Sequence, residues 1–105
     1  MEKNYELVFD EVILRQLEHA GKNEHLRSIL SNIFDKIEEK GPRAGKLVDS
    51  KLFIYEIKLK HPPLRVYYKH NKLTNEIYLF EYEMKTSPKK QKRTLTKLRR
   101  KALET

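Results

Sequence analysis

Cations spaced two residues apart are the side chains of this sequence best suited to chemistry. Lys58 and Lys60 fall on one side of an apolar segment, and Arg65, Tyr67 and Lys69 fall on one side of the next. A guanidinium can bind a phosphate through two hydrogen bonds, and neighbouring ammonium groups can stabilise added negative charge. The spacing therefore predicts a surface that binds phosphodiesters and can support their cleavage.

Metal-free cleavage of RNA, with the 2′-OH as nucleophile, defines the roles that these side chains would take. It needs a base near that hydroxyl, cations around the phosphorus, and an acid for the 5′-oxygen. Arg65 suits phosphate binding, Lys58 and Lys60 suit charge stabilisation, and Lys85 suits either charge stabilisation or protonation of the leaving oxygen. Tyr67 is predicted either to stack on a base or to pack on the sheet. No metal site is expected, because the four histidines lack metal-binding spacing.

Positive charge is concentrated in the second half of the chain. Residues 1–50 contribute 8 − 10 = −2 and residues 51–105 contribute 15 − 5 = +10, for a formal net charge of +8. Nine cations and no carboxylate lie between residues 85 and 101, a density that attracts polyanions through counterion release. Nucleic acid is the predicted partner, and a merely solubilising surface is the alternative. The residues predicted to contact RNA or the ribosome are Lys60, Tyr67, Lys69, Lys89, Lys90, Lys92 and Arg93.

Composition narrows the class of protein. A chain of 105 residues predicts a single domain, 1–105. No apolar run reaches the roughly 18 residues that span a bilayer, and the first residues do not resemble a secretion signal, so no membrane partner is expected. The absence of cysteine excludes disulfides and thiolate metal sites and fits a reducing cytoplasm. No glycine-rich phosphate loop occurs, and no cofactor is expected.

The periodicity of the apolar residues predicts the secondary structure. Alternation of apolar and polar residues predicts strands at 4–9, 52–60, 64–70 and 76–84. Helical spacing and capping residues predict helices at 11–20, 24–40 and 88–103. The strand at 76–84 has two possible facings. The first buries its aromatic residues and leaves Glu81 and Glu83 in solvent, and the second buries Ile77 and Leu79 together with the two glutamates. We prefer the first.

These elements predict an α+β fold. An N-terminal strand and a helical hairpin pack on an antiparallel sheet, and a basic helix, lightly anchored by a narrow apolar stripe, follows at the C-terminus. The helices are expected on one face of the sheet. The other face is expected to be open to solvent and lined by the strand cations named above.

Two stretches carry a resemblance to a known family. FIYEIKLKHPPLRVYYK, residues 53–69, resembles the core of the RelE/ParE toxin superfamily, where a strand with alternating cations is followed by a hairpin and an Arg-hydrophobic-x-Tyr strand. EMKTSPKKQKRTLTKLRRKAL, residues 83–103, is similar to the HigB branch, where a Thr/Ser-Pro-Lys segment starts the last helix. The resemblance implies a RelE-like fold and the toxin of a toxin–antitoxin pair, with a cognate antitoxin as partner.

The branches of this superfamily imply different activities. Toxins of the RelE and HigB branches cleave mRNA in the ribosomal A site, which implies an endoribonuclease that inhibits translation and has the ribosome and mRNA as partners. Toxins of the ParE branch inhibit DNA gyrase, which is the alternative activity. A basic nucleic-acid-binding domain without catalysis is a third interpretation.

The resemblance also implies site residues. Lys58 matches a strand lysine of RelE-like nucleases, Arg65 matches their most recurrent arginine, and Lys85 matches a cation at the end of the last strand. Glu56 stands where these enzymes often have another lysine, and no tyrosine of the C-terminal segment matches their catalytic tyrosine. Because HigB-like and related toxins use histidine or carboxylate groups, His61 and Glu56 are the candidate bases.

Overall fold

The computed structural model describes residues 4–84 and 87–104. Its elements are β1 (Glu6–Phe9), α1 (Glu11–Ala20), α2 (Glu24–Lys40), the 3-10 helix η1 (Gly41–Ala44), β2 (Lys46–Asp49), β3 (Ile54–Leu59), β4 (Leu64–Asn71), β5 (Glu76–Met84) and α3 (Pro88–Glu104). The predicted strands and helices are present, with ends that differ from the expected ranges by up to two residues. Strand β2 is an element that the sequence-based prediction omits.

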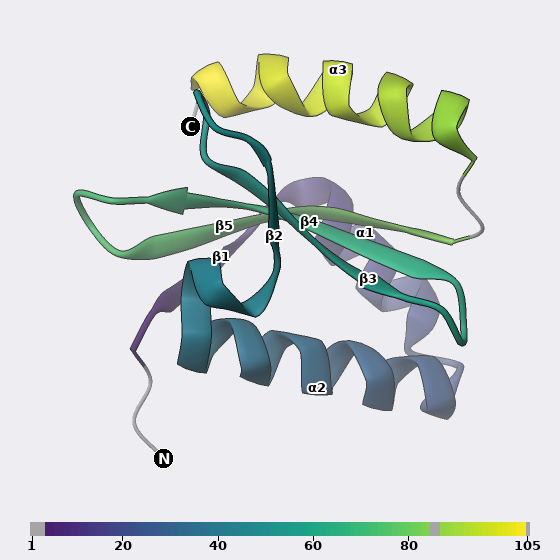
Figure 1. The fold of residues 1–105 in the computed structure, drawn as a ribbon. Helices are drawn as coiled ribbons and strands as arrows, with labels where there is room; N and C mark the ends of the chain where they lie inside the picture. The colour runs from purple at the N-terminus through teal and green to yellow at the C-terminus, as the bar shows by residue number, and fades with distance from the viewer. Residues whose placement is uncertain (1–3, 85–86, 105) are drawn as a thin grey trace.

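The five strands form one sheet in the order β1-β5-β4-β3-β2 (Figure 1). Strands β2 to β5 pair antiparallel with their neighbours, while β1 runs parallel to β5. The α+β class and the mostly antiparallel sheet are therefore confirmed. The parallel pair brings Glu6 opposite Glu76 and Phe9 opposite Leu79, so the first strand meets the last.

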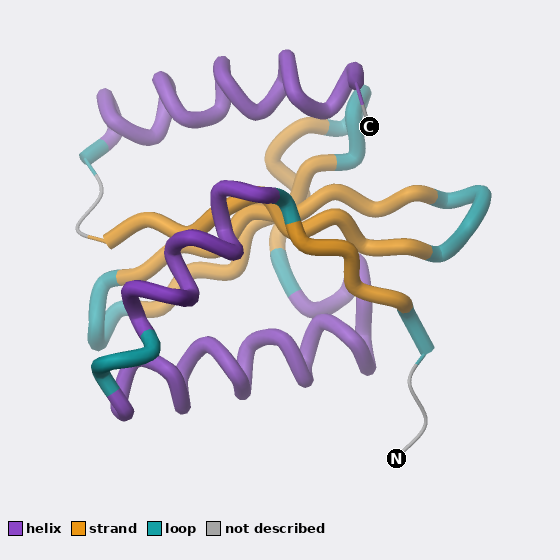
Figure 2. Tube along the Cα trace, turned by 180° about the vertical axis from the view of Figure 1, so that it is seen from behind, coloured by secondary structure: helices purple, strands orange, loops and turns teal. Residues whose placement is uncertain are grey.

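Capping side chains start the two N-terminal helices, as predicted. The Asp10 carboxylate accepts a hydrogen bond from the Val12 amide at 2.9 Å, and the Asn23 side chain accepts one from the Leu26 amide at 3.1 Å. Both helices pack on the same face of the sheet (Figure 2). The main core lies between them and the sheet, and its buried members include Ile13, Leu30, Ile37, Val66, Tyr68, Ile77 and Leu79.

Helix α3 covers the opposite face of the sheet, so the expectation of an open face is wrong (Figures 1 and 2). Leu98 and Ala102 of α3 pack in a second core with Ile54, Tyr67 and Phe80 of the sheet. The apolar stripe of α3 is narrow, but it meets a complementary apolar patch on the strands. The fold is therefore a sheet between two helical layers. Among the described residues, no helix is long and apolar enough to span a membrane.

A β-bulge in β5 changes which side of the sheet its residues face. Tyr67 pairs with Glu81, but the next residue of β4 pairs with Leu79, so the residue at position 80 has no partner of its own. Before the bulge, Ile77 and Leu79 enter the main core; after it, Glu81 and Glu83 are buried on the α3 side. Neither predicted facing holds for the whole strand. The expectation that the two glutamates are in solvent is wrong.

Candidate functional site

Cross-strand register arranges charged side chains in two rows on the face beneath α3. In the first row Lys58 lies opposite Arg65, which lies opposite Glu83. In the second row Glu56 lies opposite Tyr67, which lies opposite Glu81. Residues two apart on a strand point to the same side, so the two rows are adjacent. We call the buried members of these rows, with the α3 residues that contact them, the polar cluster: Glu56, Arg65, Tyr67, Glu81, Glu83, Gln91, Thr94 and Lys97.

Arg65 lies at the centre of the first row. Its Nη1 is 3.2 Å from Oε2 of Glu56, and only 14% of its side chain is exposed. Gln91 of α3 donates to the same Glu56 oxygen at 3.0 Å. The Nε atom of Arg65 is buried and has no hydrogen-bond partner among the described residues. A buried N–H donor without an acceptor is costly, so this group is available to an anion that reaches it.

Two hydroxyl groups surround Glu83. Tyr67 donates to its carboxylate at 3.0 Å, and the Thr94 hydroxyl of α3 donates to its other oxygen. Burial, reinforced by the negative charge of Glu83, raises the pKa of Tyr67. Tyr67 therefore remains a neutral donor. Beside them, the Lys97 ammonium lies 2.9 Å from the Glu81 carboxylate.

The C-terminal half of α3 is tied to the sheet and loops by further polar contacts. Arg99 pairs with Asp49 at 2.7 Å, and Lys101 pairs with Asp10 at 2.7 Å. Lys69 donates to the Ala102 carbonyl at 2.8 Å, where the last carbonyls of a helix lack partners of their own. Contacts along the length of the helix therefore hold α3 against the sheet.

The two aspartates in these contacts have pKa values below their ordinary range. Burial raises the pKa of Asp10, but hydrogen bonds from Lys101, Tyr78 and the Val12 amide outweigh burial and lower it. The hydrogen bond from Arg99 is the main cause that lowers the pKa of Asp49. Burial, together with the hydrogen bond to Asp10, raises the pKa of Tyr78 to about 12.

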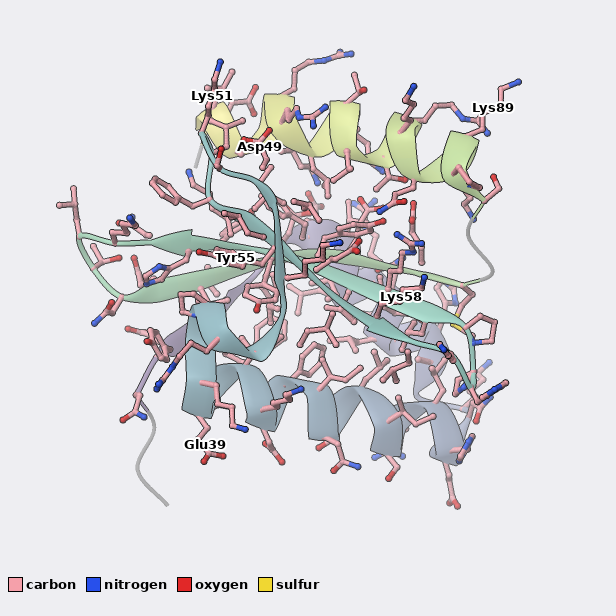
Figure 3. All side chains as sticks on the ribbon, in the orientation of Figure 1. Glu39, Asp49, Lys51, Tyr55, Lys58 and Lys89 are labelled. Carbon is pink, nitrogen blue, oxygen red and sulfur yellow. The ribbon has the colours of Figure 1, made fainter. Side chains whose placement is uncertain are left out.

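Exposed cations lie at the margin of the polar cluster. Lys58 is exposed at the end of the first row and lies beneath the N-terminal half of α3 in Figure 3. Lys60 and His61 are exposed in the turn that follows β3. The α3 residues Lys89, Lys90, Lys92 and Arg93 are exposed as well. Lys85 lies outside the described residues.

The structure brings some of the predicted site residues together and separates others. Lys58, Arg65 and Glu56 lie close to one another, whereas His61 lies in the turn. Tyr67 is fully buried, so of its two predicted roles the structure shows packing on the sheet; α3 takes the space that a stacked base would need. Lys69 holds the end of α3 and is not an open cation. Among the described residues, no group of three or more His, Asp or Glu could hold a metal ion.

The sequence-based prediction missed most of the residues that complete the polar cluster. Glu81 and Glu83 were expected in solvent, and the α3 residues Gln91, Thr94 and Lys97 were not singled out. Three carboxylates, Glu56, Glu81 and Glu83, in the mostly cationic second half of the chain were a signal that a basic partner covers them. A helix with eight cations and a narrow apolar stripe is such a partner.

Comparisons with known proteins give a match in structure alone. No family model matches the sequence, and no curated protein matches it. The isolated Escherichia coli RelE toxin superposes with a TM-score of 0.65 at 19% identity, covering 90% of this chain and 98% of RelE. The chain has the RelE fold. One chain of the intact E. coli RelBE toxin–antitoxin complex superposes with a TM-score of 0.64 at 21% identity, covering 79% of this chain and 99% of that one.

Proposed function

We propose that this chain is the toxin of a toxin–antitoxin pair and cleaves mRNA in the ribosomal A site. The observation that carries the proposal is the position of Arg65 on the RelE fold, in one row with Lys58 and beside Glu56, with its Nε donor unsatisfied among the described residues. These are the group types that metal-free phosphodiester cleavage needs. One matched structure is described as a toxin–antitoxin complex, which supports an antitoxin as partner.

In the proposed reaction each group has one role. The base takes the proton of the 2′-OH, the 2′-oxygen bonds to phosphorus, and the bond from phosphorus to the 5′-oxygen breaks as that oxygen gains a proton. Arg65 would bind the two non-bridging oxygens as their charge increases, and Lys58 would stabilise the same charge. Glu56 is the nearer candidate base, because its carboxylate contacts Arg65, whereas His61 lies in the turn. Lys85 remains a candidate acid.

Access to Arg65 requires only the N-terminal half of α3 to move in this proposal, while the C-terminal half stays on the sheet. The guanidinium lies beneath the N-terminal half of the helix, where Gln91 contacts Glu56 and Thr94 contacts Glu83. Both contacts are single side-chain hydrogen bonds, each worth about 0.5 to 3 kcal/mol net. Binding of RNA to the exposed cations at this margin can offset an energy of that size.

Cleavage of ribosome-bound mRNA by purified protein, with the 5′ and 3′ ends mapped, tests the proposal. Arg65→Lys keeps the charge beside Glu56 but removes the planar fork, and Lys58→Ala removes an exposed cation. We expect each variant to lower the single-turnover rate by about 100- to 1000-fold while ribosome binding changes little, because transition-state charge is stabilised preferentially. Lys22→Ala, an exposed lysine after α1, is the matched control. Parental cleavage rates in both folded variants would contradict the proposal.

A nucleic-acid-binding domain without catalysis is a second candidate, because Arg65 is already paired with Glu56 and covered by α3. Such a protein would bind nucleic acid and leave ribosome-bound mRNA intact. The same assay separates the two functions, since only a nuclease produces new mRNA ends that depend on Arg65.

A further inference from the structure

The outer surface of α3 carries a groove that extends from the exposed cations Lys92 and Arg93 toward the C-terminal end of the helix. It is open, has a volume of about 550 Å³, and is lined by Lys92, Arg93, Leu95, Thr96, Lys97, Arg99 and Arg100, which we call the α3 groove. Five of the seven lining residues are cations and none is acidic. Helix α3 contains a single carboxylate, at Glu104 in its last position, so no acidic side chain of the helix neutralises the groove.

The cations of the α3 groove form two rows on either side of Thr96. Lys92 and Arg99 are seven residues apart on one side, and Arg93 and Arg100 are seven residues apart on the other. Seven residues are about two helical turns, so each row is about 10 Å long. Phosphates of one strand of a duplex follow one another by about 3.4 Å along the duplex axis, so a row that lies along that axis spans about three of them.

The inner side of α3 holds these rows in place. Arg99 is fixed by Asp49 and Lys97 by Glu81, while Leu98 and Ala102 are buried against the sheet. Within residues 4–84 and 87–104, no carboxylate forms an ion pair with Lys92, Arg93 or Arg100. The sheet therefore orients the helix and leaves its outermost cations to a partner, which lowers the entropic cost of binding.

We propose that the α3 groove binds the phosphate backbone of a double-stranded nucleic acid, independently of sequence. A duplex fits better than a single strand, because α3 has no aromatic residue on which an unpaired base could stack. A membrane surface fits poorly, because most of the apolar stripe that would enter the lipid is packed against the sheet. This binding uses the exposed side of α3, opposite the buried Leu98 and Ala102, and does not require that the chain cleaves RNA.

Fluorescence anisotropy with RNA and DNA duplexes of about 20 base pairs, titrated over a range of salt, tests this proposal. The test variant is Arg93→Ala/Arg100→Ala. The control is Arg27→Ala/Arg43→Ala, which removes the same charge from exposed arginines of α2 and η1. Loss of two phosphate contacts should reduce the slope of log K against log salt concentration by about 1.8. Between 1 M and 0.1 M salt, the affinity of the variant should therefore rise by roughly 60-fold less than that of the parent chain. The control should keep the parental slope, and Lys92→Ala should lose about half as much.

Several outcomes would overturn the proposal. The test and control variants could lose equal affinity, or a single strand could bind more tightly than the duplex. The chain could also prefer one of the two duplexes by more than tenfold, or its affinity could be independent of salt. Anionic vesicles or polyglutamate bound as tightly as the duplex would also overturn it. Thermal unfolding checks that each variant is folded, which we expect since the substituted side chains are exposed.

Discussion

Removal of the Arg65 side chain should destabilise the folded chain far more than removal of an exposed arginine. Arg65→Ala leaves the buried Glu56 carboxylate with Gln91 as its remaining hydrogen-bond donor among the described contacts. Loss of one partner from a buried ion pair costs about 3 to 5 kcal/mol, because the other charge stays buried without compensation. For a domain of this length, that loss should lower Tm by about 15 to 25 °C.

Thermal and urea unfolding of a matched pair of variants measure this effect. Arg15→Ala breaks an ion pair with Glu11 in which both side chains are mostly exposed, at 70% and 77%, and such pairs contribute about 0.5 kcal/mol or less. The double variant Arg65→Met/Glu56→Gln removes both charges and should recover much of the stability lost in Arg65→Ala. If Arg65→Ala were as stable as Arg15→Ala, the buried pair would not stabilise the fold, and the reasoning would fail.

Three further predictions concern the attachment of α3. The pKa of Asp10 in the folded chain is lowered from 3.8, so the Asp10 carboxylate stabilises the fold above pH 3.8, and this stabilisation is lost as the pH falls through the folded pKa. Asp10→Asn should therefore flatten the decline of the free energy of unfolding in acid, measured by urea unfolding. An unchanged decline would contradict this prediction. The pKa of Tyr78 in the folded chain is raised from 10.0 to about 12, so its contribution to stability is complete below pH 10 and is lost as the pH rises through about 12. Tyr78→Phe should remove this loss of stability at alkaline pH in the same assay. A loss identical to that of the parent chain would argue against the prediction. Leu98→Ala removes a fully buried side chain and should cost about 2 to 5 kcal/mol. Hydrogen exchange of this variant should rise in α3 before it rises in α2, and equal protection of the two helices would contradict this prediction.

The local elements were predictable because each depends on residues close together in the sequence. Asn23 as a cap and the apolar stripe that follows it specify α2, and alternation specifies β3 and β4. Strand β2 escaped the prediction because it has four residues at the edge of the sheet and no clear alternation. Its pairing depends on β3, a neighbour that provides the hydrogen bonds.

The position of α3 over the polar cluster was not predictable from local patterns. Alternation places Arg65 and Lys58 on one face, but it cannot say what lies above that face. The bulge in β5 brings Glu81 and Glu83 to the α3 side. Residues 77–80 are all apolar or aromatic, so the one-residue change of register leaves no mark in the alternation there. With three buried carboxylates there, the basic helix has partners on the sheet. Charge complementarity between distant segments, rather than any single motif, decides this part of the structure.

The parallel pairing of β1 with β5 has a consequence for the order in which the chain folds during synthesis. Residues 6–9 leave the ribosome before their partners at 76–79, which are made about seventy residues later. Until then the helical hairpin has no complete sheet to cover, and its apolar face stays exposed. Closing a loop of that length delays folding, because the chain between the two strands loses conformational entropy before the contacts between the strands compensate for it. The domain should therefore acquire its native structure only after β5 has left the ribosome.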